Sequence, residues 1–200
     1  MNEVDFSFPC GSRQFTDAEK ESLCHLAQGK KDICEIGCWV GDSTEVLAKQ
    51  AQKEGRRMTC IDWFQGNEET DLTERAKNHD ILKIFTDNMS KLGLWDNISL
   101  MVAKSQDAHS FFDDNSFDFI FLDADHRYES VRSDLLNWYE KLRYGGIFVG
   151  HDYDDSTWDE EHIHKDFVQG KHHGLIKAVN EFFNPVNVKR GNGSLWYVQK

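Results

Sequence analysis

The chain has 200 residues, of which 39% are hydrophobic and 12% aromatic, which is enough apolar material for the core of one α/β domain. Its 35 acidic and 23 basic residues give a net charge of −12, which argues against a surface that follows nucleic-acid phosphates. No apolar run approaches the roughly 20 residues of a membrane helix, and the first residues lack the order of a signal peptide. We therefore expect one domain over 1–200 that is cytoplasmic and binds a small molecule, not nucleic acid or a membrane.

The N-terminal part of the chain, residues 1–30, is expected to be a helical extension of this domain. Thr16 is followed three residues later by Glu19, which is the spacing of a capping box. This spacing predicts a helix that runs from Asp17 to about Gln28.

From there the sequence alternates between short apolar runs and helical periodicity. Strands are predicted over 32–36, 58–62, 98–102, 117–122 and 147–149. Helices are predicted after Asp42 as N-cap, over 71–91, in a short segment from Ser105, over 129–142 and over 175–183. A polar, histidine-rich stretch over 153–174 is too long for an ordinary connection and indicates a lid or substrate loop.

The chain ends in two further strands, 186–189 and 195–198, which are joined by a Gly-Asn-Gly turn. Strands that alternate with helices form a parallel sheet with right-handed crossovers, and a terminal hairpin adds an antiparallel strand. The predicted fold is therefore α/β: a doubly wound, mostly parallel seven-stranded sheet with a C-terminal antiparallel β-hairpin.

The segment 35–41 joins the first strand to the next helix. It reads Glu-Ile-Gly-Cys-Trp-Val-Gly, so the strand ends in an acid and a glycine turn follows. Glycines let a backbone approach a ligand closely, and the unpaired N–H groups of a helix start attract its polar atoms. This arrangement is typical of a nucleotide-like ligand site, although a tight turn without a ligand has the same sequence. The Gly-x-Gly-x-x-Gly fingerprint of dinucleotide enzymes does not occur.

An acid also ends the second predicted strand. Asp62 lies where a carboxylate can accept hydrogen bonds from ribose hydroxyls. An NAD enzyme uses the same position, so Asp62 does not distinguish between cofactors. Ser105 follows the third strand, where a plain helix N-cap is an equally good interpretation.

Two more acids, Asp123 and Asp152, follow the fourth and fifth strands. The carboxyl ends of adjacent parallel strands form the edge where ligands bind, and two carboxylates with water suit Mg²⁺. His126 is the first candidate for a general base, because an imidazole titrates near pH ~6.5. Asp125 is the second candidate. For both residues, a solvated loop before the next helix is the competing interpretation.

These motifs follow one another in an order that resembles a known family. They comprise the acid-x-Gly-x-x-x-Gly turn, Ser-Gln at 105–106, Asp-Ala-Asp-His-Arg-Tyr-Glu at 123–129 and Gly-His-Asp-Tyr at 150–153. From about Thr16 to Phe183 the chain resembles class I S-adenosylmethionine-dependent methyltransferases. Within that class it is most similar to the small-molecule family that includes macrocin O-methyltransferase-like and cephalosporin-hydroxylase-like proteins.

The resemblance implies S-adenosyl-L-methionine as cofactor, with the Ser-Gln pair at the adenine ring as in catechol-type methyltransferases. The cofactor-binding residues that it implies are Glu35, Gly37, Cys38, Trp39, Gly41, Ser43, Asp62, Trp63, Ser105, Gln106 and Asp123. It also puts Asp123, His151 and Asp152 on the metal positions of the family. Related metal-dependent enzymes usually carry a second acid in place of His151. An imidazole there suits softer divalent metals, or it orients the substrate without a metal.

The predicted function is an S-adenosylmethionine-dependent methyltransferase that O-methylates a small hydroxylated molecule, assisted by Mg²⁺ or another divalent metal. Methyl transfer from a sulfonium is an in-line displacement, so a general base or a cation has to activate the weakly nucleophilic hydroxyl. Asp123, Asp125 and His126 are the predicted catalytic residues, and a homodimer is compatible with the resemblance. Two alternatives stay open: an NAD(P)-linked Rossmann oxidoreductase and a catalytically inactive S-adenosylmethionine-binding domain.

Overall fold

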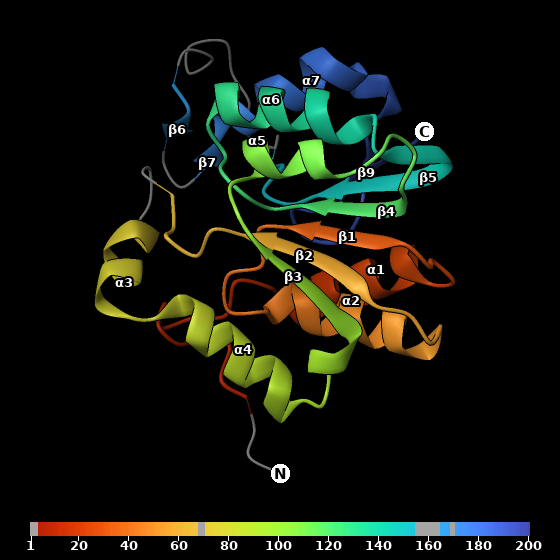
Figure 1. The fold of residues 1–200 in the computed structure, drawn as a ribbon. Helices are drawn as coiled ribbons and strands as arrows, with labels where there is room; N and C mark the ends of the chain where they lie inside the picture. Colours follow the sequence, from red (N-terminus) through yellow and green to blue (C-terminus); the bar gives the residue numbers. More distant parts are fainter. Residues whose placement is uncertain (1–3, 68–70, 155–164, 169–170) are drawn as a thin grey trace.

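The computed structural model describes residues 4–67, 71–154, 165–168 and 171–200. Its main sheet contains β1 (Ile33–Ile36), β2 (Met58–Asp62), β3 (Ile98–Val102), β4 (Phe117–Leu122), β5 (Leu142–Gly150), β8 (Lys189–Arg190) and β9 (Trp196–Gln199). The strands lie in the order β3-β2-β1-β4-β5-β9-β8 (Figure 1). Strands β1 to β5 are parallel, whereas β9 is antiparallel to both β5 and β8. The predicted fold class is confirmed, with a short hairpin at the C-terminus.

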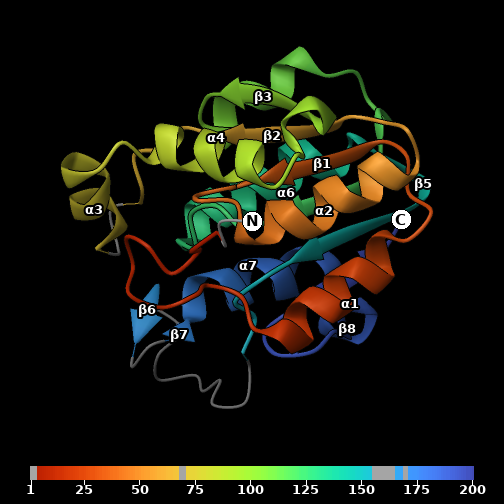
Figure 2. The same ribbon diagram turned by 90° about the horizontal axis from the view of Figure 1, so that it is seen from below.

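The helices of the described residues cover both faces of this sheet. They are α1 (Asp17–Ala27), α2 (Asp42–Lys53), α3 (Leu72–Asn78), α4 (Ile81–Lys91), α5 (Ser105–Ala108), α6 (Tyr128–Tyr139) and α7 (His173–Phe183). Helices α5, α6 and α7 cover one face, and α1, α2 and α4 cover the other (Figure 1). Figure 2 shows α1 and α2 side by side on their face. None of the helices described is long and apolar enough to cross a membrane.

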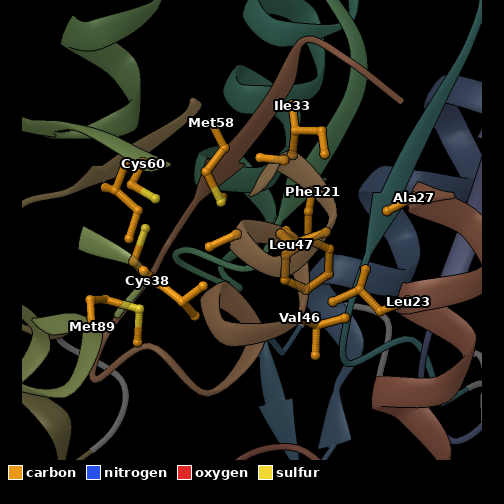
Figure 3. Close-up of a cluster of buried hydrophobic side chains, with 14 of the residues drawn as sticks. Leu23, Ala27, Ile33, Cys38, Val46, Leu47, Met58, Cys60, Met89 and Phe121 are labelled. Atoms are coloured by element: carbon orange, nitrogen blue, oxygen red, sulfur yellow. The ribbon is translucent and has the colours of Figure 1, made fainter. Parts of the chain in front are cut away.

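The apolar run of β4 explains why the sheet is covered on both sides. Phe119 and Phe121 point into the cluster under α1, α2 and α4, while Ile120 and Leu122 point into the cluster under α5, α6 and α7. Figure 3 shows the first cluster, with Phe121 close to Leu47 of α2. Burying a side chain of this size contributes roughly 1.5–3 kcal/mol, so a strand with apolar residues on both faces belongs in the middle of the sheet.

The N-terminal helix α1 begins with the predicted capping box. The Glu19 N–H donates to the Thr16 hydroxyl at 3.2 Å, and the Glu19 carboxylate accepts from the Thr16 N–H at 2.9 Å. Lys20, the residue after Glu19, donates to Glu45 of α2 at 3.0 Å, which ties the two helices together.

One predicted helix start was wrong, and one predicted helix is two helices in the structure. The N-cap of α2 is Gly41, with a left-handed backbone (φ +95°), and not Asp42. The Asp42 carboxylate instead accepts from the Phe15 N–H at 3.2 Å and pairs with Arg13, so it is not available to the helix start. The helix predicted over 71–91 is divided into α3 and α4, because the Asp80 side chain caps α4 by accepting from the Lys83 N–H.

The last strands also differ from their predicted bounds. The helix predicted over 129–142 ends at Tyr139, because Leu142 pairs with Phe117 and starts β5. The first hairpin strand, predicted over 186–189, begins only at Lys189. The preceding residues Pro185–Asn187 form a 3₁₀ turn, which the Asn184 side chain stabilises by accepting from the Val186 N–H. A second small sheet pairs β6 (Phe167–Val168) with β7 (Lys171–His172) inside the predicted lid.

Candidate active site

The glycine turn after β1 is packed against the end of β4. The Gly37 N–H donates to the Ile61 carbonyl at 2.9 Å, and the Asp123 N–H donates to the Ile36 carbonyl at 2.8 Å. The backbone of Gly37 is left-handed (φ +91°), and a Cβ atom there would lie 1.9 Å from the Asp123 carbonyl oxygen. A side chain at this position is therefore incompatible with the approach of the two strand ends.

Asp62 at the end of β2 holds the same turn from the other side. Its Oδ2 atom accepts from the backbone N–H groups of Cys38 at 2.7 Å and Trp39 at 2.8 Å. Its Oδ1 atom accepts from the Phe64 N–H at 2.6 Å. Burial raises the pKa of Asp62, although these backbone donors oppose the shift.

Glu35 lies beneath the turn and is completely buried. Its carboxylate accepts from the Ser43 hydroxyl at 2.5 Å. Burial raises the pKa of Glu35 to about 7. Burial likewise raises the pKa of the Cys38 thiol, which is directed at the Ile61 carbonyl. Glu35, Cys38 and Ser43 therefore support the turn from within the protein.

A cavity of about 150 Å³ opens at the carboxyl ends of β1 to β4. Of the predicted cofactor residues, it is lined by Gly37, Trp39, Asp62, Trp63, Ser105, Gln106 and Asp123. Lys104 and Arg127, which the sequence had not singled out, line it as well. The Lys104 ammonium lies 4.4 Å from the centre of the Trp63 ring. Glu35 and Gly41 are not among the described lining residues.

A second cavity of about 120 Å³ adjoins the first. The two share Gly37, Trp39 and Asp123 in their linings. The second is further lined by Phe15, Cys38, Ser43, His126, His151 and Asp152. The structure thus brings the predicted catalytic and metal residues to the edge of the predicted cofactor site.

His126 lies between the two strand-end acids. Its Nε2 atom is 3.2 Å from Asp123 Oδ1 and 3.4 Å from Asp152 Oδ2. Burial would lower the pKa of His126, but the hydrogen bond to Asp123 and the charge of Asp152 raise it above the usual value. Burial would raise the pKa of Asp152, but the surrounding imidazoles hold it well below the usual value.

His151 lies on the other side of the same acids and is buried. Its Nδ1 atom is 3.5 Å from Asp152 Oδ1 and 3.8 Å from Asp123 Oδ2, and its Nε2 atom is 3.0 Å from Glu19 Oε1. Burial would lower the pKa of His151, but these carboxylates raise it well above the usual value. Burial would raise the pKa of Glu19, but hydrogen bonds from His151, Thr16 and Ser194 lower it to about 2.

Asp152 has a left-handed backbone (φ +58°), which is unusual for a residue other than glycine. Its N–H donates to the Ser194 hydroxyl at 3.2 Å. The conformation turns the carboxylate so that Oδ1 faces His151 and Oδ2 faces His126. Backbone strain of this kind is common where side chains converge for function.

His172 joins the cluster from β7, inside the predicted lid. Its Nε2 atom is 3.9 Å from Asp152 Oδ2, and its ring centre is 4.3 Å from that of His126. Burial and the charge of His126 lower the pKa of His172 to about 4. The only hint of His172 in the sequence is that histidines recur in this region, at 162, 164, 172 and 173. His162 and His164 lie outside the described residues.

Asp125, the second candidate base, is engaged elsewhere. Its carboxylate accepts from the Arg127 N–H at 3.1 Å, the Arg127 guanidinium at 2.8 Å and the Ser130 hydroxyl at 3.0 Å. Burial would raise the pKa of Asp125, but the hydrogen bonds from Arg127 lower it. Asp125 thus organises the start of α6 next to the cavity.

The donor atoms of Asp123, His151 and Asp152 lie within 4.8 Å of one another. Ligands about 2.0–2.2 Å from a common cation lie about 3–4 Å apart, so the cluster fits a divalent ion. His126, Asp152 and His172 form a second, overlapping set by the same measure.

Several solved structures share this fold. Rv0187 from MTB, solved with a bound cofactor, has a TM-score of 0.67 at 17% identity and covers 94% of this chain and 82% of that chain. The O-methyltransferase from Bacillus cereus, in complex with SAH, has a TM-score of 0.62 at 18% identity over 94% and 83%. The O-methyltransferase TomG from Streptomyces achromogenes, in complex with SAM, has a TM-score of 0.62 at 15% identity over 98% and 84%. The fold is that of class I methyltransferases.

The sequence defines the family more closely than the fold does. Residues 34–153 match the family model described as a methyltransferase domain, which is more than half of the chain. The chain therefore belongs to this methyltransferase family, and the predicted resemblance to S-adenosylmethionine-dependent methyltransferases is confirmed over an NAD(P)-linked oxidoreductase. A search of curated protein sequences finds no significant match. The matched region excludes Glu19 and His172, which both reach the site.

Proposed function

We propose that the protein transfers the methyl group of S-adenosylmethionine to a hydroxyl oxygen of a small molecule. The observation that carries this proposal is the junction of the two cavities at Gly37 and Asp123. One cavity has the acid and the Ser-Gln pair expected for a nucleoside, and the other has an imidazole between two carboxylates. A methyl group at the junction would face the second cavity.

Asp62, Ser105 and Gln106 are the main contacts proposed for the nucleoside. Asp62 lines the first cavity, where a ribose hydroxyl can donate a hydrogen bond to its carboxylate. Ser105 and Gln106 line the same cavity and offer polar groups to a heterocyclic ring. Because the glycines of the turn have no side chains, the cofactor can lie directly against the backbone there.

His126 is the proposed general base, and not Asp125. The acceptor oxygen attacks the methyl carbon in line, the carbon–sulfur bond breaks, and the hydroxyl proton passes to the His126 imidazole. The sulfonium becomes a neutral thioether, and the proton leaves to solvent after product release. Asp123 and Asp152 stabilise the imidazolium that forms, since both carboxylates lie within 3.4 Å of Nε2.

Asp123, His151 and Asp152 are the proposed ligands of a divalent cation. Their spacing and their carboxylate and imidazole donors support this assignment. Such an ion, when bound, would polarise the acceptor hydroxyl as a Lewis acid.

Calorimetry with S-adenosylhomocysteine and NADPH tests the cofactor. We expect micromolar binding of S-adenosylhomocysteine and no binding of NADPH. Binding of NADPH alone would overturn the proposal.

A screen of hydroxylated acceptors with methyl-labelled cofactor separates an active enzyme from an inactive binding domain. Label transfer that disappears in Asp152→Ala, while S-adenosylhomocysteine affinity stays within about twofold, supports the proposed division of the site. Absence of transfer to every acceptor class, with the cofactor bound, would favour the inactive domain.

A further inference from the structure

Glu19, in the first turn of α1, has two different sets of partners. Its Oε2 atom accepts from the Thr16 N–H at 2.9 Å and the Thr16 hydroxyl at 2.7 Å, which completes the capping box. Its Oε1 atom lies 3.0 Å from His151 Nε2 and accepts from the Ser194 N–H at 3.1 Å. Only 7% of the Glu19 side chain is exposed. A capping box uses one oxygen, so the buried second oxygen has a separate role.

Glu19 and Phe15 together hold the His151 ring in one orientation. The Phe15 ring stacks on His151 with centres 4.4 Å apart and planes at 21°. When a neutral imidazole donates its Nε2–H to a carboxylate, its lone pair is on Nδ1. His151 Nδ1 faces Asp152 Oδ1 at 3.5 Å and Asp123 Oδ2 at 3.8 Å. In the neutral ring, which is the form that binds a metal ion, this lone pair would be directed at the point where the two carboxylates converge.

The same Glu19 oxygen also supports the second acid. The Ser194 hydroxyl donates to Glu19 Oε1 at 3.3 Å and accepts from the Asp152 N–H at 3.2 Å. The left-handed turn at Asp152 is therefore connected to α1 through one serine. Glu19 therefore contacts His151 directly and Asp152 through Ser194.

We propose that Glu19 is a positioning residue that makes His151 Nδ1 a metal ligand. The resulting nitrogen-containing centre would favour first-row transition ions such as Mn²⁺ or Co²⁺ over Mg²⁺. This inference rests on the proposed function and specifies its metal. An imidazole nitrogen suits transition ions, whereas Mg²⁺ prefers oxygen ligands and retained water. A carboxylate behind a ligating histidine fixes the ring orientation and increases the basicity of the ligand atom.

Calorimetric titration of the metal-free full chain with Co²⁺ tests the role of Glu19. Glutamine also completes a capping box, so Glu19→Gln keeps the helix start but removes the charge behind His151. We expect this variant to bind Co²⁺ about 10–100-fold more weakly than the wild type. Thr16→Ala is the matched control, because it removes the helix cap and leaves the contact between Glu19 and His151 in place. Its Co²⁺ affinity should stay within twofold.

His151→Asp tests the nitrogen ligand directly. Pulsed EPR of bound Mn²⁺ should show ¹⁴N modulation in the wild type, and the modulation should be lost in the variant. The ratio of Co²⁺ to Mg²⁺ affinity should fall at least tenfold. Persistent ¹⁴N modulation in His151→Asp would assign the nitrogen to His126 or His172 and overturn the proposal.

Two further results would also overturn it: unchanged Co²⁺ affinity in folded Glu19→Gln, or no divalent ion bound by the wild type at millimolar concentration. S-adenosylhomocysteine titrations of the same samples separate this inference from the proposed function. If the protein binds S-adenosylhomocysteine but no divalent ion, only the proposed metal centre is excluded. If it does not bind S-adenosylhomocysteine, the methyltransferase proposal itself is excluded.

Discussion

The two halves of the candidate site are built in different ways. The half around Gly37 and Asp62 is held mainly by backbone groups, with the Asp62 carboxylate accepting three N–H donors from two neighbouring turns. The half around Asp123 and Asp152 consists of charged side chains. It is assembled from α1, the ends of β4 and β5, and β7.

This difference separates binding from chemistry. Backbone donors hold a fixed shape and do not titrate, which suits a half that accommodates one cofactor. Imidazoles between carboxylates can gain and lose protons or bind a cation, which suits a half that activates an acceptor. Substitutions should therefore affect one half and leave the other nearly unchanged.

The largest effect is expected from Gly37→Ala. The new Cβ atom would overlap the Asp123 carbonyl, and the left-handed backbone disfavours alanine. We expect S-adenosylhomocysteine binding to be undetectable by calorimetry and the melting temperature to fall. Gly55→Ala is the matched control, because Gly55 is also left-handed (φ +64°) but a Cβ atom there meets nothing within 4 Å. The control should cost only about 1 kcal/mol and retain binding. Equal effects of the two substitutions would show that the contact with Asp123 is unimportant.

The next effect is expected from His126→Gln. Glutamine can occupy the space between Asp123 and Asp152, but it cannot accept the hydroxyl proton. We expect turnover of the acceptor found in the screen to fall by about 10²–10⁴-fold. S-adenosylhomocysteine affinity, measured by calorimetry, should stay within twofold because His126 belongs to the other half. Near-normal turnover would exclude His126 as the base.

A smaller effect is expected from Asp62→Asn, in the backbone-held half. The amide keeps the shape but loses the charge that strengthens the hydrogen bonds from Cys38 and Trp39. We expect S-adenosylhomocysteine affinity to fall by about 1.5–3 kcal/mol, which is roughly 10–100-fold. The companion variant Asp152→Asn should leave this affinity unchanged. A similar loss in both variants would contradict the division of the site.

The two halves also differ in how far the sequence predicted them. The glycine turn, Asp62 and the Ser-Gln pair are local patterns, and the structure places them around one cavity. The strand-end acids were predicted to converge because the carboxyl ends of parallel strands share one edge. His172 and the second role of Glu19 were not predicted, since each depends on a packing contact between segments far apart in the chain.

The errors in the fold have the same origin. Asp42 has the sequence of an N-cap, but tertiary contacts with Arg13 and the Phe15 backbone engage its carboxylate. The helical periodicity over 71–91 does not reveal that Asp80 starts a new helix. Local patterns thus predicted which elements form, and long-range contacts decided where several of them begin and end.

The last prediction compares a half-buried acid, Asp152, with a buried one, Asp134. Asp152 faces three imidazoles, whereas Asp134 in α6 is completely buried and neither of its oxygens makes a hydrogen bond of standard geometry within the described residues. Burial raises the pKa of Asp134 to about 7, although the Ser105 hydroxyl opposes the shift. Asp134 should therefore be protonated in the folded protein at acidic to neutral pH, and its ionisation above that range should destabilise the fold.

The sign of the pH effect follows from proton binding. Between pH 4 and 7 the folded protein keeps a proton on Asp134 that the unfolded chain has lost, so the free energy of unfolding falls as pH rises. Asp134→Asn removes this dependence. We expect the variant to gain stability relative to the wild type by on the order of 2 kcal/mol between pH 5 and 8, measured by urea unfolding. Glu35, with a pKa of about 7, contributes a similar slope to both proteins, so their difference isolates Asp134. A difference that is constant with pH would mean that Asp134 is ionised in the fold, and that its surroundings resemble those of Asp152 after all.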